Sequence, residues 1–154
     1  MANKLYASFI LCILLVWITG CGKAPNPDGR EDVWGSITLN GEPVLTGIIA
    51  FRSVTEEGQN GEGGGAIING KYYLTGRDGV KPGEYKVNLF ATYEYDSQTG
   101  ELATLETTAE RLRSVDMIPA GYGRDTTLAF TVQKGARNVF NYNVVAETPT
   151  FPGR

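Results

Sequence analysis

From Val33 onward the sequence is a succession of short β-prone runs separated by turn residues, and this pattern limits the fold more than any other feature. Asn-Gly pairs at 40–41 and 69–70 tolerate positive φ, and Pro-Gly at 82–83 separates two further runs. Between the turns, apolar and polar residues alternate with a period of two, which is typical of strands buried on one face. Seven strands are predicted, at residues 33–39, 47–54, 65–68, 71–75, 84–92, 126–132 and 138–145. The pattern therefore predicts an all-β sandwich.

The run at 84–92 has the clearest alternation and is expected to be a central strand. One face carries only apolar or aromatic side chains, and the other is mixed. The inward set is expected to be Tyr85, Val87, Leu89 and Ala91, and the outward set Lys86, Asn88 and Phe90. A charge placed in the inward set would lie in the core.

The first 21 residues have the order of an export signal. Lys4 precedes an uncharged apolar stretch, and small residues then lead into Cys21. Ile18-Thr19-Gly20-Cys21 resembles the lipobox of bacterial lipoproteins, in which the cysteine receives lipid and becomes the first mature residue. Two alternatives stay open, an uncleaved anchor helix and an ordinary cleaved signal, because residues 5–21 are slightly short of a membrane span. All three place the rest of the chain outside the cytoplasm.

The expected organisation is a signal peptide at 1–20, a Pro- and Gly-containing lipid-anchored tether at 21–31, one domain at 32–146 and a disordered tail at 147–154. The formal net charge is −3, which argues against nucleic acid as a partner. The chain has no histidine, and its cysteines are Cys12 and Cys21. No disulfide, thiol nucleophile, metal site or cofactor is therefore expected in the exported domain.

Several segments carry a family resemblance when their order is considered. They are VWGSI at 33–37, NGEPV at 40–44, IAF at 49–51, GKYYL at 70–74, PGEYKV at 82–87, IPAGY at 118–122, the strand at 128–132 and residues 135–144. In this order they resemble the carboxypeptidase regulatory-like, or transthyretin-like, domains of small bacterial surface lipoproteins. The resemblance implies a seven-stranded Ig-like or transthyretin-like (prealbumin-like) sandwich. Many relatives have an acidic residue before the Gly that precedes Tyr72, where this chain has Ile68-Asn69.

The resemblance implies a fold and a surface location but no activity. Transthyretin-like hydrolases rely on histidines, and this chain has none. Its serines lie in no Gly-x-Ser-x-Gly motif, so a nucleophilic hydrolase is not expected either. The sequence therefore predicts a protein that is not an enzyme.

The stretch at 93–117 is the longest connection between predicted strands. Apolar residues recur there at spacings of three and four, and Thr107 with Glu110 fits a capping box. A short amphipathic helix is therefore expected, which would cover the open end of the sandwich or bind a partner. The glycine-rich segment at 58–65 is expected to be a flexible hairpin connection rather than a phosphate or calcium loop.

Four aromatic residues have no clear place in the predicted core: Trp34, Tyr93, Tyr95 and Tyr122. Exposed aromatic faces stack on sugars or bind partner surfaces, so these are the candidate ligand contacts, with strand-end packing as the alternative. The sequence thus favours a non-catalytic, lipid-anchored cell-envelope protein, periplasmic or at the outer surface, that makes structural or protein–protein contacts. A carbohydrate- or peptide-binding surface module is the alternative.

Overall fold

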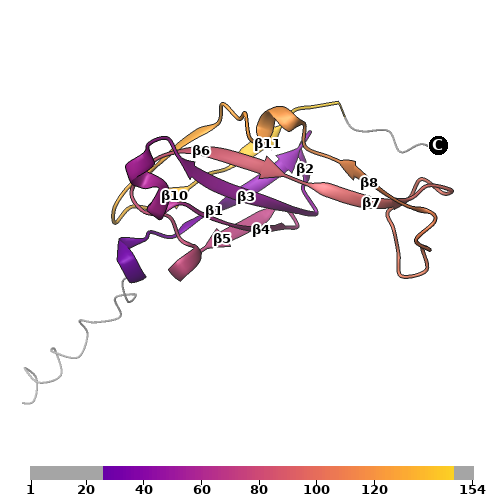
Figure 1. The fold of residues 1–154 in the computed structure, drawn as a ribbon, viewed down its shortest axis with the longest axis horizontal. Helices are drawn as coiled ribbons and strands as arrows, with labels where there is room; N and C mark the ends of the chain where they lie inside the picture. The colour runs from indigo at the N-terminus through magenta and orange to yellow at the C-terminus, as the bar shows by residue number, and fades with distance from the viewer. Residues whose placement is uncertain (1–25, 148–154) are drawn as a thin grey trace, which may run out of the picture.

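A nine-stranded sheet forms the body of the protein, and a separate two-stranded hairpin extends from it (Figure 1). The computed structural model describes residues 26–147. The strands are β1 (Val33–Leu39), β2 (Glu42–Pro43), β3 (Thr46–Ser53), β4 (Gly63–Ile68), β5 (Lys71–Leu74), β6 (Gly83–Phe90), β7 (Thr92–Asp96), β8 (Leu112–Asp116), β9 (Ala129–Val132), β10 (Asn138–Val139) and β11 (Tyr142–Val144). Short 3-10 segments precede or connect some of them: η2 (Pro27–Gly29) before β1, and η3 (Glu56–Gly61), η4 (Gly76–Asp78) and η5 (Ala120–Tyr122) between strands. The prediction of an all-β fold is confirmed.

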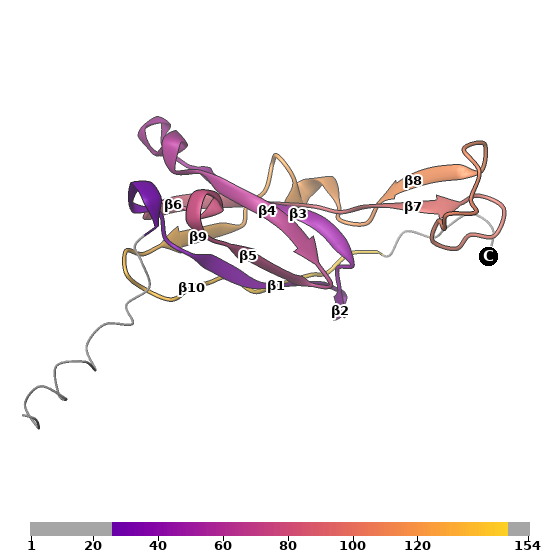
Figure 2. The ribbon, with the colours of Figure 1, turned by 90° about the horizontal axis from the view of Figure 1, so that it is seen from below.

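The large sheet has the order β10-β1-β5-β4-β3-β6-β9, with β2 and β11 also paired to β1. Its neighbours are antiparallel except where β10 and β11 run parallel to β1. Strands β4 and β5 share only the pair Ile68 and Lys71, next to their turn, so the sheet curls between them (Figure 2). The curl brings both halves of the sheet around one core.

Two of the predicted turns have the backbone conformation that their sequence requires. Asn40 and Gly41 have φ of 53° and 90°, and Asn69 and Gly70 have φ of 48° and 74°. Positive φ at both central residues matches the right-handed twist of the flanking strands in a hairpin. These turns fix the register of β1 with β2 and of β4 with β5.

The core is built from the predicted inward faces. Tyr85, Val87, Leu89 and Ala91 are all buried, as expected. At the centre, the Phe51 ring lies 5.9–6.5 Å from four other aromatic rings. These rings are Tyr72, Tyr85, Phe130 and Phe140.

The predicted strand at 138–145 is divided into β10 and β11 by Phe140 and Asn141. The Asn141 side chain accepts a hydrogen bond from the Ser36 N–H at 2.8 Å and so takes the place of a backbone acceptor. Gly35 lies opposite, and a Cβ there would overlap the Phe140 carbonyl oxygen. Backbone pairing is therefore interrupted where β1 and the segment at Phe140 and Asn141 lie in close contact.

The prediction of a helix within 93–117 is wrong. This stretch contains most of β7, all of β8 and the loop 97–111 between them. The Thr107 hydroxyl accepts from the Thr104 N–H at 3.1 Å, and the Arg111 N–H bonds to the Thr108 carbonyl. The threonine-rich stretch thus forms isolated turns, because its hydroxyls satisfy backbone groups locally. Leu105, expected on the buried face of the helix, is fully exposed.

The last residues of the predicted tether contact the domain. Arg30 donates to the carbonyls of Glu62 at 2.8 Å and Gly79 at 2.6 Å, and Glu31 pairs with Val80. The described chain therefore enters the fold beside η3 and η4, before β1 begins.

Candidate functional site

The predicted lipidation residue, Cys21, lies outside the described residues, as do residues 148–154 of the predicted tail. Asn26 is the first described residue, and its side chain donates to Asp32 at 2.7 Å.

The four candidate aromatics lie in three separate places. Trp34, on β1, packs 5.8 Å from the Tyr73 ring and has the Arg137 guanidinium 6.0 Å from its own ring. Tyr122 contacts the Tyr142 ring at 5.9 Å. Tyr93 and Tyr95 belong to β7, where Tyr95 is buried. No shared aromatic face results.

Tyr73 is a surface aromatic that the sequence reasoning missed. It stands opposite Trp34 in the antiparallel pair of β1 and β5 and is largely exposed. The alternation of Tyr73 with buried Tyr72 and Leu74 was the available signal. Residues on the same face of paired strands lie close enough to pack, so half-buried Trp34 and exposed Tyr73 form one small aromatic pair.

The β7–β8 hairpin with its loop is the feature most separate from the sheet, and we call residues 92–116 the arm. Both views show it projecting beyond the strands of the sheet, at the end opposite η2 (Figures 1 and 2). Its base is held by the Tyr93 hydroxyl, which accepts from the Leu45 N–H at 2.6 Å, and by the Met117 N–H, which donates to Ala91. Leu102 and Leu105 are exposed on it.

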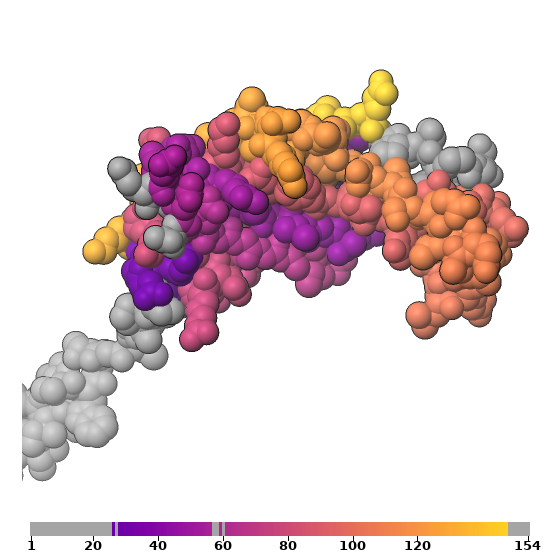
Figure 3. Space-filling model, viewed as in Figure 1, coloured from indigo at the N-terminus to yellow at the C-terminus, as the bar shows by residue number. Residues whose placement is uncertain are grey.

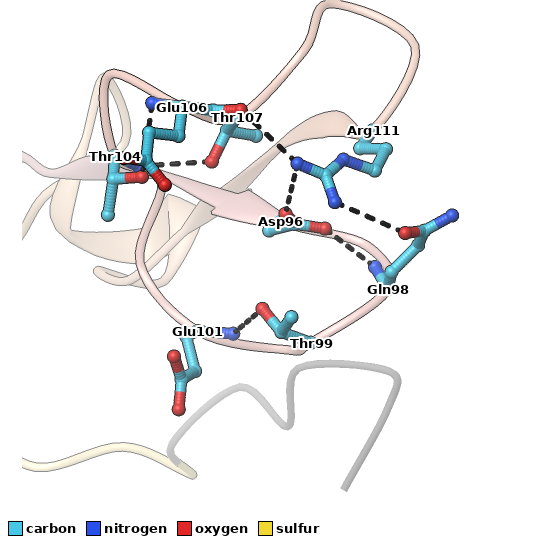
Figure 4. A network of polar contacts seen from close by, with 8 residues as sticks. All are labelled: Asp96, Gln98, Thr99, Glu101, Thr104, Glu106, Thr107 and Arg111. Atoms are coloured by element: carbon cyan, nitrogen blue, oxygen red, sulfur yellow. Dashed lines mark hydrogen bonds and ion pairs between the residues drawn. The ribbon is translucent and has the colours of Figure 1, made fainter.

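A polar network orders the arm (Figure 4). Asp96 is buried and pairs with Arg111 at 3.3 Å, and it also accepts from the Gln98 N–H at 2.9 Å. Arg111 reaches on to the Gln98 side chain at 3.2 Å and the Glu106 carbonyl at 3.3 Å. A buried carboxylate is stable only when it is paired in this way. The network therefore gives the loop 97–111 a defined shape without an apolar core.

A pocket of about 440 Å³ lies where the arm meets β3. Its lining mixes leucines with hydroxyl groups and one carboxylate. The lining residues are Leu45, Thr46, Thr92, Tyr93, Glu94, Leu102, Ala103 and Ser114. With one acid and no second acid facing it, the lining suits contact with a side chain better than acid–base chemistry.

The shifted pKa values belong to residues with structural roles. Burial raises the pKa of Tyr72, whose hydroxyl donates to the Phe140 carbonyl at 2.8 Å. Burial likewise raises the pKa of Tyr85, which donates to the Lys81 carbonyl. Hydrogen bonds from its own backbone and from Thr108 lower the pKa of Glu110 in the arm. Each group is a donor or acceptor that fixes a local conformation.

Residues 26–147 contain no group of three or more His, Cys, Asp or Glu residues placed to hold a metal ion. Within the same stretch, no helix has the length and apolar character needed to cross a membrane. No family model, curated protein or solved structure matches this chain.

Proposed function

We propose that this chain is a non-catalytic, lipid-anchored protein of the bacterial cell envelope that contacts another protein through its arm. The anchor rests on Ile18-Thr19-Gly20-Cys21 and the apolar stretch before it. The absence of histidine supports a role without catalysis, because the chain lacks the commonest general base.

The observation that carries the proposal is the position of the arm. Four residues lie between Cys21 and Asn26, so Asn26, next to η2, is within about 18 Å of the bilayer surface when Cys21 is anchored. The arm is at the other end of the long axis of the molecule (Figures 1 and 2). The arm therefore points away from the membrane, where an envelope partner is accessible.

The surface of the arm suits a contact. Leu105 is fully exposed and Leu102 is nearly half exposed, and both lie on the ordered loop 97–111. Apolar side chains on a pre-shaped loop lose little entropy on binding, which favours specific association. The arm thus offers exposed apolar side chains on an ordered loop for a contact.

For the fold, we infer that the curled sheet is a sandwich of the transthyretin-like kind. The single β4–β5 pair supports this, because it allows β1, β5, β10 and β11 to face β3, β4, β6 and β9. The aromatic cluster around Phe51 fills the space between these two groups.

Site-specific photocrosslinking in cells tests the proposed contact. A photoreactive amino acid at Leu105 should give one adduct of defined mass, and one at exposed Ile68 on β4 should not. Equal adducts from both positions, or none from Leu105, would contradict the proposal. Processing to a lipidated Cys21, detected by mass spectrometry, is the check on the anchor.

Peptide or glycan binding is the second candidate function, and the pair of half-buried Trp34 with exposed Tyr73 favours it. Trp34 is the only tryptophan after Cys21, so the fluorescence of the processed protein reports on this pair. A ligand stacked on the pair should shift that emission. Unchanged emission across neutral sugars and peptides would exclude it.

A further inference from the structure

The outer face of β3 and β6 changes from apolar to cationic along the strands. Paired residues on this face form three rows, Ile48 with Phe90, Ala50 with Asn88, and Arg52 with Lys86. The segment at η5 packs against β6 and covers part of this face (Figure 3). A pocket of about 610 Å³ results, lined by Arg52, Lys86, Asn88, Phe90 and Arg124.

This pocket is lined by positive charge. Three of its five lining residues are cationic, and none is acidic. Among the described residues, no carboxylate forms a salt bridge with Arg52, Lys86 or Arg124, whereas Arg111 in the arm is paired with Asp96. Glu84 and Asp125 are near in sequence but do not line the pocket. Three cations gathered on a chain of net charge −3 favour a bound anion.

Asn88, which lines the same pocket, has an unsatisfied hydrogen-bond acceptor. Asn88 is 5% exposed, and its Nδ2 donates to the Gly123 carbonyl, but no donor reaches its Oδ1. A buried amide oxygen without a donor has lost its bonds to water and gained nothing in return. The Asn88 side chain beside the pocket is therefore anchored to Gly123 through its Nδ2 alone.

The remaining wall is apolar. Phe90 is 42% exposed, and Ile48, its partner across the strands, is also exposed. Gly123 lies close over Phe90, since a Cβ there would come within 2.9 Å of the ring. Aromatic rings in such positions pack against the C–H faces of sugars.

We propose that this pocket binds an acidic sugar, meaning a hydroxylated ring that carries a carboxylate or phosphate group. Arg52 and Arg124 hold the oxyanion, because guanidinium groups match its oxygens bidentately, and the Lys86 ammonium adds a point charge. The sugar ring packs on Phe90, beside the Asn88 side chain. This inference goes beyond the proposed function, because it concerns a different face from the arm.

Saturation-transfer NMR on the full chain in a non-ionic detergent tests the ligand class. Glucuronate and glucose 6-phosphate should bind, with glucose, acetate and inorganic phosphate at least about tenfold weaker. Affinity for the acidic sugars should fall with added salt. No binding of either acidic sugar would overturn the proposal. Equal binding of acetate or inorganic phosphate would also overturn it, because the site would then recognise only charge.

A matched pair of variants tests the site. Arg124→Gln should weaken glucuronate binding about tenfold, since it removes a charged hydrogen-bond donor. Arg77→Gln makes the same charge change at an exposed position in η4, outside the pocket, and should change the affinity less than twofold. Equal effects of the two variants would contradict the assignment.

Two more measurements distinguish a sugar site from a surface that binds any anion or a lipid headgroup. Phe90→Ala should weaken glucuronate binding more than acetate binding, and circular dichroism verifies that the variant is folded. An equal loss for both ligands would contradict packing of the sugar ring on Phe90. Binding to phosphatidylglycerol vesicles that requires Arg52 and Arg124, without binding of acidic sugars, would overturn the proposal in favour of a membrane contact.

Discussion

The sheet and the arm are stabilised by different interactions. In the sheet, alternating apolar residues such as Val87 and Ile49 are completely buried around Phe51. In the arm, the leucines Leu102 and Leu105 are exposed, and buried Asp96 forms an ion pair with Arg111. Apolar burial stabilises the whole fold, whereas a polar network mainly fixes the shape of one segment. The sheet therefore acts as a platform, and the arm is free to present its apolar side chains.

A substitution to Asp should reduce stability greatly in the sheet and hardly at all in the arm. Val87→Asp places an unpaired charge at a site with no exposure and should cost about 4 kcal/mol or more, enough to unfold many domains. Leu105→Asp, on the exposed loop of the arm, should change the free energy of unfolding by less than about 0.5 kcal/mol. Thermal unfolding followed by circular dichroism measures both. Melting of Val87→Asp at the wild-type temperature would mean that the register of β6 is wrong by one residue.

A second pair of variants tests the packing of β1 on the segment between β10 and β11. Gly35→Ala places a Cβ against the Phe140 carbonyl oxygen and should cost about 2 kcal/mol. Gly121→Ala has no atom within 4 Å of the new Cβ and should leave the unfolding midpoint in urea nearly unchanged. Equal midpoints for the two variants would contradict the close approach at Gly35.

Tyr72 links stability of the sheet to alkaline pH. Burial raises its pKa above the unfolded value of 10.0, so the folded protein keeps the proton that the unfolded chain releases. This contribution is complete below pH 10 and is lost as the pH rises toward the folded pKa. Tyr72→Phe should lose about 1 kcal/mol near neutral pH with the hydrogen bond to Phe140, and should show a shallower alkaline decline. An unchanged decline in urea unfolding above pH 10 would assign the effect to other groups.

In the arm, a change to the network should act locally. Asp96→Asn removes the charge that pairs with Arg111 but leaves the apolar core intact. We expect faster amide hydrogen exchange in residues 97–111 and an unfolding midpoint close to wild type. Arg113→Gln is the control, because it also changes one charge in the arm, but Arg113 bonds to the carbonyls of Glu110 and Leu112 close to it in sequence and not to Asp96. Protection of the loop in Asp96→Asn equal to that of the control would show that the network does not order it.

Local patterns explain which parts of the fold were predictable. The two Asn-Gly turns and the alternation of Val87 with Lys86 depend on neighbours in sequence, and both predictions are confirmed. The arm depends on β7 meeting β8 across the loop 97–111, and an apolar spacing typical of a helix concealed this pairing. Long-range pairing is not encoded in a local period, which is why the helix prediction was wrong.

The candidate sites were less predictable for the same reason. Arg52 and Lys86 are neighbours only because β3 and β6 pair in one register, and Arg124 joins them from a distant segment. Asn88 follows the predicted outward pattern, yet it is buried because the segment after η5 covers it. Alternation gives the direction of a side chain but not what lies over it.

The orientation of the arm relative to the membrane is the most direct test of the account. No cysteine follows Cys21, so a single cysteine introduced as Asp28→Cys or Leu105→Cys can carry one donor dye in the lipidated protein. On vesicles with an acceptor dye in the lipid headgroups, energy transfer should be high from position 28 and low from position 105. Equal or higher transfer from position 105 would place the arm at the bilayer and contradict the proposal that it presents a contact surface away from the membrane.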